Sequence, residues 1–411
     1  MSSAIKARFS EVIEALRRSV RPVDRPAERV PLLEAEGRFL ADDIAARFDF
    51  PLFNNAAMDG FAVRSAEWTD AGDAELTLPV AAEITAGHPC TQSLPAKAVV
   101  RIMTGAKMPD GFDAVIPIEK TTATAQTVTF APGTLKAGTN MRRRGEIFST
   151  GDVLLARNTQ LKKGHIGLAA SLGLAELPCV TRLTAAVFSS GDELVEPADG
   201  APLGEGRIYN ANGTYVTLLA RSLGIAADYQ GILPDDPAVI EARMRETAGR
   251  YDIVICSGGV GPGDCDFTAE VLNRLAELHH YHVAMRPGKP FSFGYFKEAG
   301  TLILGLPGNP VAAANAGSHF IEAALETLLG VKLPDATQTV RVSGRIKSRP
   351  GRRDFVRGTL TPSSDGLPIF RAGSQQSSAS LLGVAAGNAV LTVPEDCELL
   401  SDGDTAEAFP D

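Results

Sequence analysis

The chain has 411 residues, of which 44% are hydrophobic, 6% aromatic and 22% charged. This length suggests roughly two to four domains, and the apolar content suffices for a packed core in each. Forty-nine acidic against 40 basic side chains leave a formal net charge of −9, which argues against a general nucleic-acid-binding surface. An anionic ligand would have to be held by a local basic site.

The cysteines and the N-terminus indicate the compartment. Five cysteines, far apart and without a CxxC pair, argue against a disulfide framework and a structural zinc site, and so favour a reducing compartment. No apolar run approaches the roughly 18 residues that would span a bilayer, and the N-terminus is charged where a signal peptide would be apolar. We expect a cytoplasmic protein that binds neither membrane nor nucleic acid.

Helical patterns flank a β-like region in the first 180 residues. Apolar residues at helical spacing predict an amphipathic helix over 9–20, and an Ala/Leu-rich segment within 159–174 predicts a second, short helix. Between them, short apolar runs punctuated by Gly, Pro and Asn indicate β-rich structure with long excursions. The runs that we expect to be strands cover 76–84, 98–103 and 114–118.

Residues 181–330 have a different pattern, in which strand-like runs alternate with helical segments. This alternation predicts βαβ units and a mainly parallel, doubly wound sheet. Ligands bind beyond the carboxyl ends of the strands in such sheets, so the loops after the strands are candidate functional sites. We expect strands at 185–188, 227–233, 252–256 and 301–306, and helices at 215–223, 238–247, 269–278 and 311–329.

The C-terminal region returns to short alternating strands after about residue 331. Runs at 340–346, 354–360 and 389–393 predict a small β-barrel or sandwich. The predicted fold class is therefore multi-domain α/β plus β: a doubly wound α/β domain with a β-rich inserted domain and a C-terminal β-barrel.

Three loops of the α/β region could bind an anion. The strand at 252–256 runs into Ser257, Gly258 and Gly259, whose backbone amides could form an anion-binding nest, although a glycine turn can also be purely structural. The strand at 301–306 runs into Pro307, Gly308, Asn309 and Pro310, with Asn309 expected as N-cap and Pro310 at the first helical position. Arg286 and Lys289 stand in a proline-rich turn between the two. Together the three loops predict a pocket for a phosphorylated ligand.

Acidic residues follow the same strands. They are Asp192 and Glu193, Asp235 and Asp236, and Asp264 and Asp266. Carboxylates beside a phosphate site commonly hold Mg²⁺, which needs only one or two protein ligands. Helix capping is the alternative for Asp236 and Asp266, because both precede helical segments.

Three further groups of residues could have a chemical role. Arg142, Arg143 and Arg144 form a basic run that either binds an oxyanion or makes a solvated surface. His280 and His282 could share a strand face as metal ligands, but no acid or cysteine stands at ligand spacing. Cys256 and Cys265 have no base beside them in the sequence, so we do not expect either to be a nucleophile.

Eight motifs stand in the order found in one family. On these motifs the chain resembles the molybdopterin molybdenumtransferases, the molybdenum insertases that share their fold with the E domain of gephyrin, over nearly its whole length. The motifs are Asn54 to Val63, Arg101 to Ala106, Arg142 to Glu146, Ser189 to Leu194, Ser257 to Val260, Pro287 to Pro290, Leu306 to Pro310 and Pro350 to Gly358.

The resemblance implies a homodimer that uses Mg²⁺ to convert adenylylated molybdopterin and molybdate into molybdenum cofactor and AMP. Its active site would lie between the α/β domain of one subunit and the β-rich domain of the other, and other proteins of molybdenum cofactor biosynthesis are possible partners. The implied catalytic residues are Asp59, Glu193, Asp235, Asp266 and Lys289, with Glu193 and Asp266 on the metal. The implied substrate-binding residues are Thr104, Arg142, Ser257, Gly258, Gly259, His282, Arg286, Pro307, Gly308, Asn309, Pro310 and Arg357.

The resemblance also implies a domain division. We expect an N-terminal helix packing on the α/β domain (1–26), a connecting domain (27–46 and 147–180), a β-rich inserted domain (47–146), an α/β molybdopterin-binding domain (181–331) and a C-terminal β-barrel domain (332–411).

The chain departs from the family pattern at three positions. Ile147 stands where an Asp is common, while His282 and Arg286 stand where lysines are usual. Arg286 keeps the charge with a different geometry, and His282 is charged only if its pKa is raised.

Two other functions remain open. A gephyrin-like chain can act as a scaffold for a partner peptide, and a co-purified pterin nucleotide would argue against that role. A nucleotide-sugar or dinucleotide enzyme is the second alternative, against which the lack of a GxGxxG motif counts.

Overall fold

The structure is a computed structural model that describes residues 4–68, 74–133, 135–197, 202–259 and 267–410. The chain divides into two units. The larger unit comprises Met1–Ala41, Asn158–Gly167 and Ala175–Asp411, and the smaller unit comprises Asp42–Arg157 and Leu168–Leu174. Within the described ranges, no helix has both the length and the apolarity that a membrane crossing requires.

Four parallel strands form one end of the main sheet in the larger unit, in the order β17, β14, β18, β21, with β17 at the edge. The crossovers from β14 to β17 and from β17 to β18 each contain one helix and return the chain in parallel, as the alternating sequence pattern predicts. The strands are β14 (Thr184–Ser190), β17 (Ala226–Leu233), β18 (Ile253–Ser257) and β21 (Leu302–Leu306).

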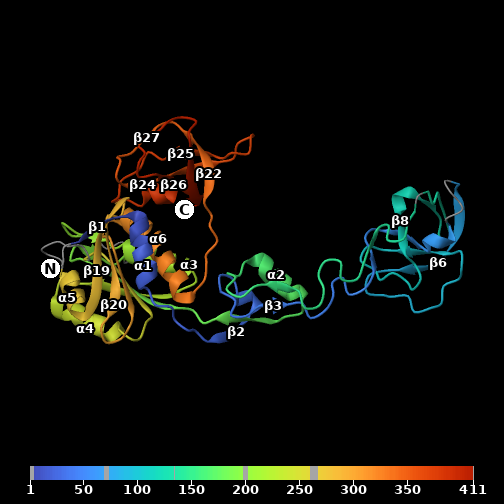
Figure 1. The fold of residues 1–411 in the computed structure, drawn as a ribbon, viewed down its shortest axis with the longest axis horizontal. Helices are drawn as coiled ribbons and strands as arrows, with labels where there is room; N and C mark the ends of the chain where they lie inside the picture. The colour runs from blue at the N-terminus through green and yellow to red at the C-terminus, as the bar shows by residue number, and fades with distance from the viewer. Residues whose placement is uncertain (1–3, 69–73, 134, 198–201, 260–266, 411) are drawn as a thin grey trace. The chain divides into compact units, whose positions relative to one another are not determined.

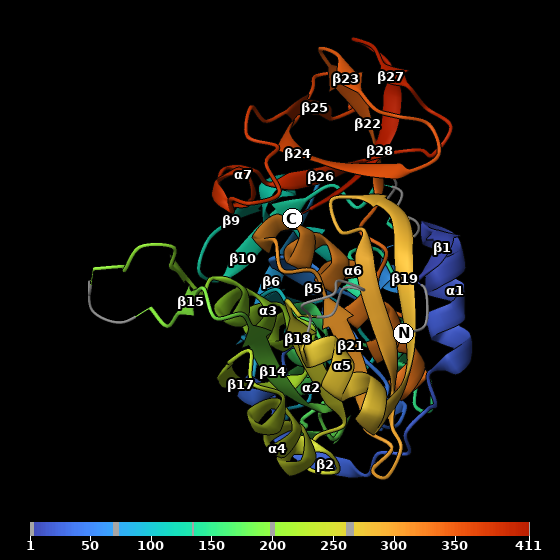
Figure 2. The same cartoon turned by 90° about the vertical axis from the view of Figure 1, so that its left-hand side faces the viewer.

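Helices cover both faces of these four strands (Figures 1 and 2). Ile253 and Ile255 of β18 pack in one hydrophobic core with α1, α3 and α6, whereas Val254 and Cys256 pack in the other with α4 and α5. Alternate residues of a strand point to opposite faces, so an uninterrupted apolar run supplies both cores. The helices are α1 (Phe9–Ser19), α3 (Asn212–Ser222), α4 (Pro237–Thr247), α5 (Phe267–Leu275) and α6 (Pro310–Leu329).

The part of the sheet beyond β21 differs from the predicted parallel arrangement. β19 (Ala276–Arg286) and β20 (Pro290–Phe296) form an antiparallel hairpin beside β21, and β1 (Ile5–Arg8) pairs in parallel with β19. The helix expected to reach residue 278 therefore ends at Leu275. Pairing of Ala276, Glu277 and Leu278 with β20 overrides their local helix propensity.

A closed β-barrel follows in the larger unit. The ring of pairings runs β22, β25, β24, β26, β28 and back to β22, around a core that includes Val340, Phe370 and Leu391. Met285 and Arg286 of β19 pair with Arg353 and Asp354 of β24, which joins the barrel to the main sheet. The barrel strands are β22 (Gln338–Ser343), β24 (Arg353–Thr361), β25 (Ile369–Ala372), β26 (Ala389–Val393) and β28 (Thr405–Pro410), with β23 (Ile346–Lys347), β27 (Leu399–Leu400) and α7 (Leu382–Ala386) beside them.

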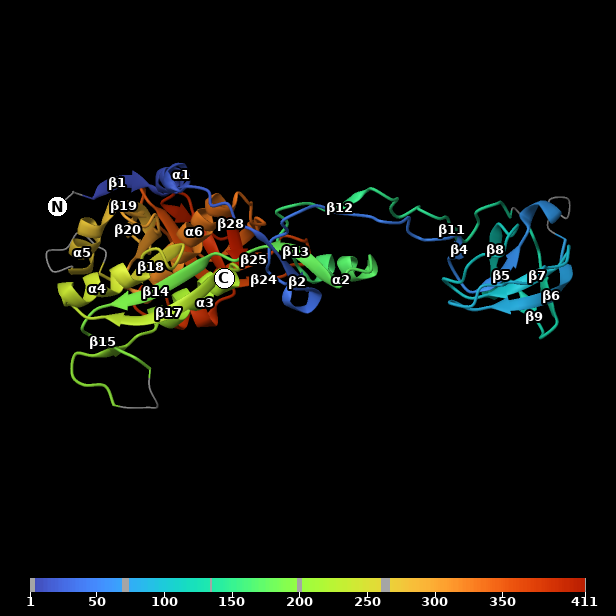
Figure 3. The ribbon, with the colours of Figure 1, turned by 90° about the horizontal axis from the view of Figure 1, so that it is seen from below.

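The smaller unit is built on a six-stranded sheet in the order β8, β5, β7, β6, β10, β9 (Figure 3). Val99 and Val100 of β7 belong to different hydrophobic cores, so side chains from both faces of this strand are buried. The strands of this unit are β3 (Ile44–Ala45), β4 (Asn55–Ala56), β5 (Gly60–Val63), β6 (Leu76–Ile84), β7 (Val99–Ile102), β8 (Ala114–Pro117), β9 (Thr122–Ala123), β10 (Thr127–Phe130), β11 (Met141–Arg142) and β12 (Val153–Leu155).

The remaining elements are short. β2 pairs with β13, and β15 pairs with β16, both in the larger unit. Their bounds are β2 (Ala27–Pro31), β13 (Glu176–Val180), β15 (Leu194–Val195) and β16 (Ile208–Tyr209), with the short helix α2 at Lys163–Ser171 and 3-10 turns at Leu32–Glu34, Ser65–Glu67 and Ile118–Lys120.

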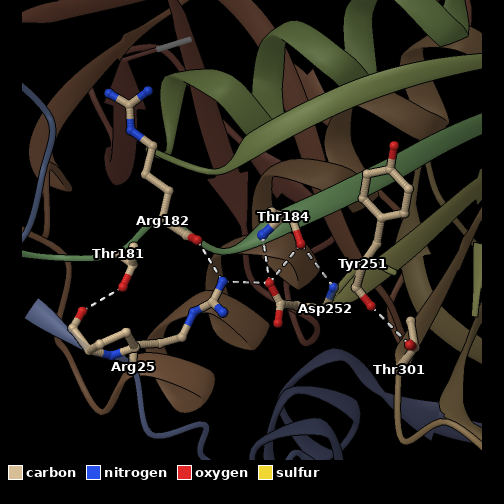
Figure 4. A network of polar contacts seen from close by, with 8 residues as sticks. Arg25, Thr181, Arg182, Thr184, Tyr251, Asp252 and Thr301 are labelled. Atoms are coloured by element: carbon tan, nitrogen blue, oxygen red, sulfur yellow. Dashed lines mark hydrogen bonds and ion pairs between the residues drawn. The ribbon is translucent and has the colours of Figure 1, made fainter. Parts of the chain in front are cut away.

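A polar network at the amino ends of β14 and β18 attaches the N-terminal segment to the sheet (Figure 4). Asp252 Oδ2 lies 2.6 Å from Arg25 Nη2 and accepts hydrogen bonds from Thr184 N and Oγ1 at 2.7 and 2.8 Å. The same Arg25 guanidinium donates to the Arg182 carbonyl at 2.6 Å. One carboxylate thus connects three separate segments of the chain.

Candidate functional site

The glycine turn after β18 needs glycine at both of its central positions. Gly258 and Gly259 have φ of +84° and +60°, and a Cβ on Gly258 would lie 2.6 Å from the Ser190 carbonyl oxygen. Gly258 N donates to the Leu306 carbonyl at 3.1 Å. This amide is therefore used within the fold, and the prediction that the turn's amides are free for an anion is wrong for Gly258.

The loop after β21 starts α6 as predicted, with Asn309 at the N-cap and Pro310 in the first turn. The Asn309 side chain makes no capping hydrogen bond to the described chain. Val311 N, one of the amides that an α-helix leaves unpaired at its start, donates to the Ser378 carbonyl at 3.0 Å. A segment beside the barrel thus meets the start of α6.

A basic cavity of about 1280 Å³ lies in the larger unit, next to this loop. It brings together seven residues predicted to bind substrate or take part in catalysis, namely His282, Arg286, Lys289, Pro307, Gly308, Asn309 and Arg357. Eight cationic side chains of the described chain line it, against the two acids Glu11 and Asp354. The cations are Lys6, Arg8, Arg286, Lys289, Arg345, Lys347, Arg352 and Arg357. In a protein of net charge −9, this local reversal of sign predicts an anionic ligand.

One buried carboxylate contacts two of these cations. The carboxylate of Asp354, whose side chain is 5% exposed, lies 2.8 Å from Arg352 Nε and 3.8 Å from Arg286 Nη1. The Arg286 side chain is 56% exposed, so its guanidinium remains accessible from the cavity. Arg357 is 4% exposed, and its backbone carbonyl accepts a hydrogen bond from Gln376 at 2.7 Å.

His282 contributes no fixed charge to the cavity. Burial lowers its pKa, and the nearby Lys289 and Lys6 lower it further. The imidazole is therefore neutral at pH 7, in contrast to the lysine usual at this position.

The idea that His280 and His282 bind a metal gains no support, because no group of three or more potential ligands occurs among the described residues. His280 instead forms a 2.8 Å hydrogen bond with Asn273.

The acids follow neighbouring strands, as expected. Asp192 Oδ1 accepts a hydrogen bond from Asp235 N at 3.0 Å, which holds the loops after β14 and β17 together. The Glu193 side chain folds over Gly191, and a Cβ on that glycine would lie 2.3 Å from Glu193 Oε2.

Asp236 caps α4 through Ala238 N and Val239 N, which confirms the capping interpretation for that residue. Asp264, Cys265 and Asp266 lie outside the described residues, so neither the capping nor the metal hypothesis for Asp266 is tested.

Asp59, Thr104 and Arg142 lie in the smaller unit. Asp59 Oδ1 accepts hydrogen bonds from Thr104 N and Oγ1, and these bonds lower the pKa of the carboxyl, helped by the charge of Arg101. Arg142 of β11 pairs with Asn55 of β4 and is exposed. Of the two other arginines in the basic run, Arg144 forms an ion pair with Asp49 at 2.9 Å.

Two residues of the site were missed by the sequence analysis. Asn210 and Asn212 lie at the start of α3 and hydrogen-bond to side chains and backbone at the carboxyl edge of the sheet. The only sequence signal was two asparagines around Ala211, directly before a helical segment.

Three family models match successive parts of the chain. They are described as the MoeA N-terminal region (domain I and II) at 7–173, a probable molybdopterin binding domain at 186–327, and the MoeA C-terminal region (domain IV) at 339–410. The fold and the basic cavity, with these matches, define a protein of the molybdopterin-binding class.

Relatives identify the family. A molybdopterin molybdenumtransferase of Haemophilus influenzae is 36% identical over 95% of both chains, and molybdopterin molybdenumtransferase 2 of Mycobacterium tuberculosis is 34% identical over 94% of both. The crystal structure of the molybdopterin biosynthesis moeA protein from Pyrococcus horikoshii OT3 has a TM-score of 0.82 and 25% identity, covering 99% of this chain and all of that one. The chain belongs to the molybdopterin molybdenumtransferase family of enzymes.

Proposed function

We propose that this protein is a molybdenum insertase that transfers molybdenum from molybdate into adenylylated molybdopterin and releases AMP, giving molybdenum cofactor. The observation that carries the proposal is the basic cavity beside the carboxyl edge of the sheet. Its Pro307–Asn309 loop adjoins the glycine turn, and its cations suit both the oxyanion and the phosphates of the pterin nucleotide.

The cationic lining favours a multiply charged oxyanion. One fixed cation about 4 Å from a unit negative charge contributes about 4 kcal/mol at an effective dielectric of 20, before desolvation is subtracted. Molybdate carries two such charges. Arg286, Lys289 and Arg357 are the cations that we assign to it, because they belong to the predicted site and line the cavity.

Magnesium is the metal that we assign to the carboxylates, and the donors present fit it. Glu193 is exposed and lies in the loop that Asp192 joins to Asp235, so hard carboxylate oxygens stand on neighbouring loops. We assign Glu193 and Asp266 as ligands, with Asp235 as a further acid of the site. When bound, Mg²⁺ would neutralise charge on the pyrophosphate that is cleaved. Lys289 would hold a phosphate or molybdate oxygen in the cavity.

A homodimer with composite sites is the assembly that we propose, in which Asp59, Thr104 and Arg142 of the partner complete the site. Apolar surface in the smaller unit supports an interface. Leu52 and Ile147 are 54% and 60% exposed, and Ile147 N donates to the carbonyl of Phe50, which is 38% exposed. Exposed apolar side chains that lie together are typical of surfaces covered in an assembly.

We keep the five-part domain division predicted from the sequence as part of this proposal. Its boundaries are at 26, 46, 146, 180 and 331. The reducing environment that the cysteines favour is consistent with a cytoplasmic enzyme. Other proteins of molybdenum cofactor biosynthesis are the further partners that we would test.

AMP release provides the test of function. Purified protein with adenylylated molybdopterin, molybdate and Mg²⁺ should release AMP. Glu193→Gln and Asp266→Asn keep side-chain shape but lose charge, so they should bind the nucleotide and fail to release AMP. Asp236→Asn is the matched control, because asparagine caps a helix as well as aspartate does. Wild-type AMP release in either test variant at limiting Mg²⁺ would remove that residue from the metal site, and no release by the wild type would reject the function.

A further inference from the structure

Asn210 connects two of the four parallel strands, β14 near its carboxyl end and β17 near its middle. Its Oδ1 accepts a hydrogen bond from Ser189 Oγ of β14 at 2.9 Å and another from Gly213 N at 3.1 Å. Its Nδ2 donates to the Tyr229 hydroxyl of β17 at 2.6 Å. The asparagine is 1% exposed, so these bonds lie in the interior.

Asn212 makes the corresponding connection between the other two strands. Its Nδ2 donates to Ser257 Oγ, at the end of β18, at 2.9 Å and to the Gly308 carbonyl, after β21, at 2.7 Å. Ser257 Oγ in turn donates to the Pro307 carbonyl at 3.0 Å. These three bonds, here called the Asn212 brace, join the glycine turn to the loop that lines the basic cavity.

The brace lies where the regular pairing of β18 and β21 ends. The registered pairs of these strands end with Ser257 and Leu306, and one further backbone bond joins Gly258 N to the Leu306 carbonyl. Beyond that point the two loops run close together, since a Cβ on Gly308 would lie 3.6 Å from the Gly258 Cα. A small displacement of either loop would therefore change the gap between them.

The chemistry of an asparagine fits this position. Its amide nitrogen carries two N–H groups, and Asn212 directs them to two acceptors on different loops. Aspartate has the same shape but donates neither bond. Asn212 and Ser257 are 9% and 1% exposed, so the loss of the amide leaves buried acceptors without these donors.

We propose that Asn212 is a positioning residue of the substrate site, which sets the relative position of the glycine turn and the Pro307–Asn309 loop. The identity of the ligand that benefits from this positioning rests on the proposed function. The hydrogen bonds of the Asn212 brace do not depend on that function. Asn212 acts through backbone and through Ser257, and it is not assigned a direct contact with substrate.

Hydrogen–deuterium exchange of the protein without ligand tests the brace. Asn212→Ala should speed exchange of Gly258 and of the amides in the Pro307–Asn309 loop about tenfold, the effect expected for one to two lost hydrogen bonds. Thr217→Val is the matched control, because Thr217 is a buried polar residue of the same helix whose hydroxyl donates within that helix, to Gly213 O at 2.6 Å. Equal exchange in Asn212→Ala and wild type, or the same increase in Thr217→Val, would overturn the proposal.

AMP binding and turnover test the effect on the site. Asn212→Ala should weaken AMP binding and lower kcat/KM about tenfold, while Thr217→Val should change neither. Ser257→Ala, which removes two of the three bonds without altering α3, provides a second variant if Asn212→Ala does not fold, and it should also loosen both loops.

The outcomes separate the two proposals. Faster exchange with wild-type AMP affinity and turnover would overturn the positioning role. Wild-type protein that neither binds nor releases AMP would reject the proposed function, and the exchange result would then decide whether Asn212 positions the loops.

Discussion

Asp59 and Thr104 form a paired contact, in which one carboxylate oxygen accepts both the backbone N–H and the hydroxyl of Thr104, each at 2.7 Å. These two bonds are the largest causes of the lowered pKa of Asp59, so the carboxylate is kept charged and in a fixed orientation. The resemblance to the family implies that both residues belong to the proposed active site, and this contact holds them together.

Loss of the Thr104 hydroxyl should weaken the stabilisation of the charged Asp59 carboxylate. Thr104→Val removes one of the two bonds, so the pKa of Asp59 should rise toward its ordinary value, whereas Thr104→Ser should leave it low. Stability contributed by a depressed carboxyl pKa is present above the unfolded-state pKa and is lost as pH falls through the folded-state value. NMR titration of the Asp59 carboxyl measures the change, and equal values in the two variants would show that the hydroxyl has no influence.

Composite active sites predict complementation between two inactive variants. Asp59→Ala and Glu193→Ala should each abolish AMP release, and an equimolar mixture with exchanged subunits should regain about a quarter of wild-type activity, because half of the dimers are heterodimers with one of two sites intact. Heterodimers then carry one site in which both residues are intact. Mixing Asp59→Ala with Asp59→Asn is the control and should restore nothing. If both variants fold and their subunits exchange but AMP release does not recover, the result contradicts composite sites.

His282 should make molybdate binding pH-dependent on the acidic side of neutrality. Its folded-state pKa lies below 6.5, so it is neutral from pH 7 to 8 and gains charge only as pH falls further. The window is thus lower than the range centred near pH 6.5 that an unshifted histidine would give. Molybdate affinity of the wild type should be flat above pH 7 and rise below about pH 6.5, while His282→Lys should bind more tightly at pH 7 to 8 with a flatter profile. Arg286→Ala should weaken binding at every pH. Identical profiles for wild type and His282→Lys would show that His282 does not contact the oxyanion.

His319 should limit stability in acid. Its ring packs against Phe9, Phe355 and Phe409, and burial, with the charges of Arg353 and Arg357, lowers its pKa to about 4. The unfolded chain takes up the proton near pH 6.5, so stability falls as pH drops from 6.5 to 4, by about 3 kcal/mol at the lower end. His319→Phe should match the wild type within about 1 kcal/mol at pH 7 and lack this acid-dependent loss in urea unfolding. A parallel loss in both proteins would assign acid sensitivity to other groups.

Asp252 should stabilise the larger unit through its contacts with Arg25 and Thr184 (Figure 4). Asp252→Ala removes three short contacts to a partly buried carboxylate and should lower the free energy of unfolding by about 2 to 4 kcal/mol. Asp24→Ala, at an exposed acid of the same N-terminal segment, should change it by less than about 0.5 kcal/mol. Urea denaturation compares the two variants, and an Asp252→Ala effect as small as the control would show that the network is dispensable.

Local sequence patterns were sufficient for most elements. The run at 76–84 is β6 and the run at 389–393 is β26, with the predicted bounds in both cases. Gly, Pro and alternating apolar residues act over a few neighbours, so their influence is visible in the sequence. The order of the eight motifs also indicated the family that the comparisons show.

The tertiary structure decided what depends on distant partners. Residues 276–278 belong to β19 because β20 pairs with them, and the barrel closes because β28 reaches β22. Arg357 and Lys289 line one cavity although they are far apart in the chain, and Asn212 contacts loops that follow it by dozens of residues. The neutral state of His282 has the same origin, since burial and neighbouring lysines set its pKa. Long-range contact and desolvation depend on the folded arrangement and leave no periodic signal in the sequence.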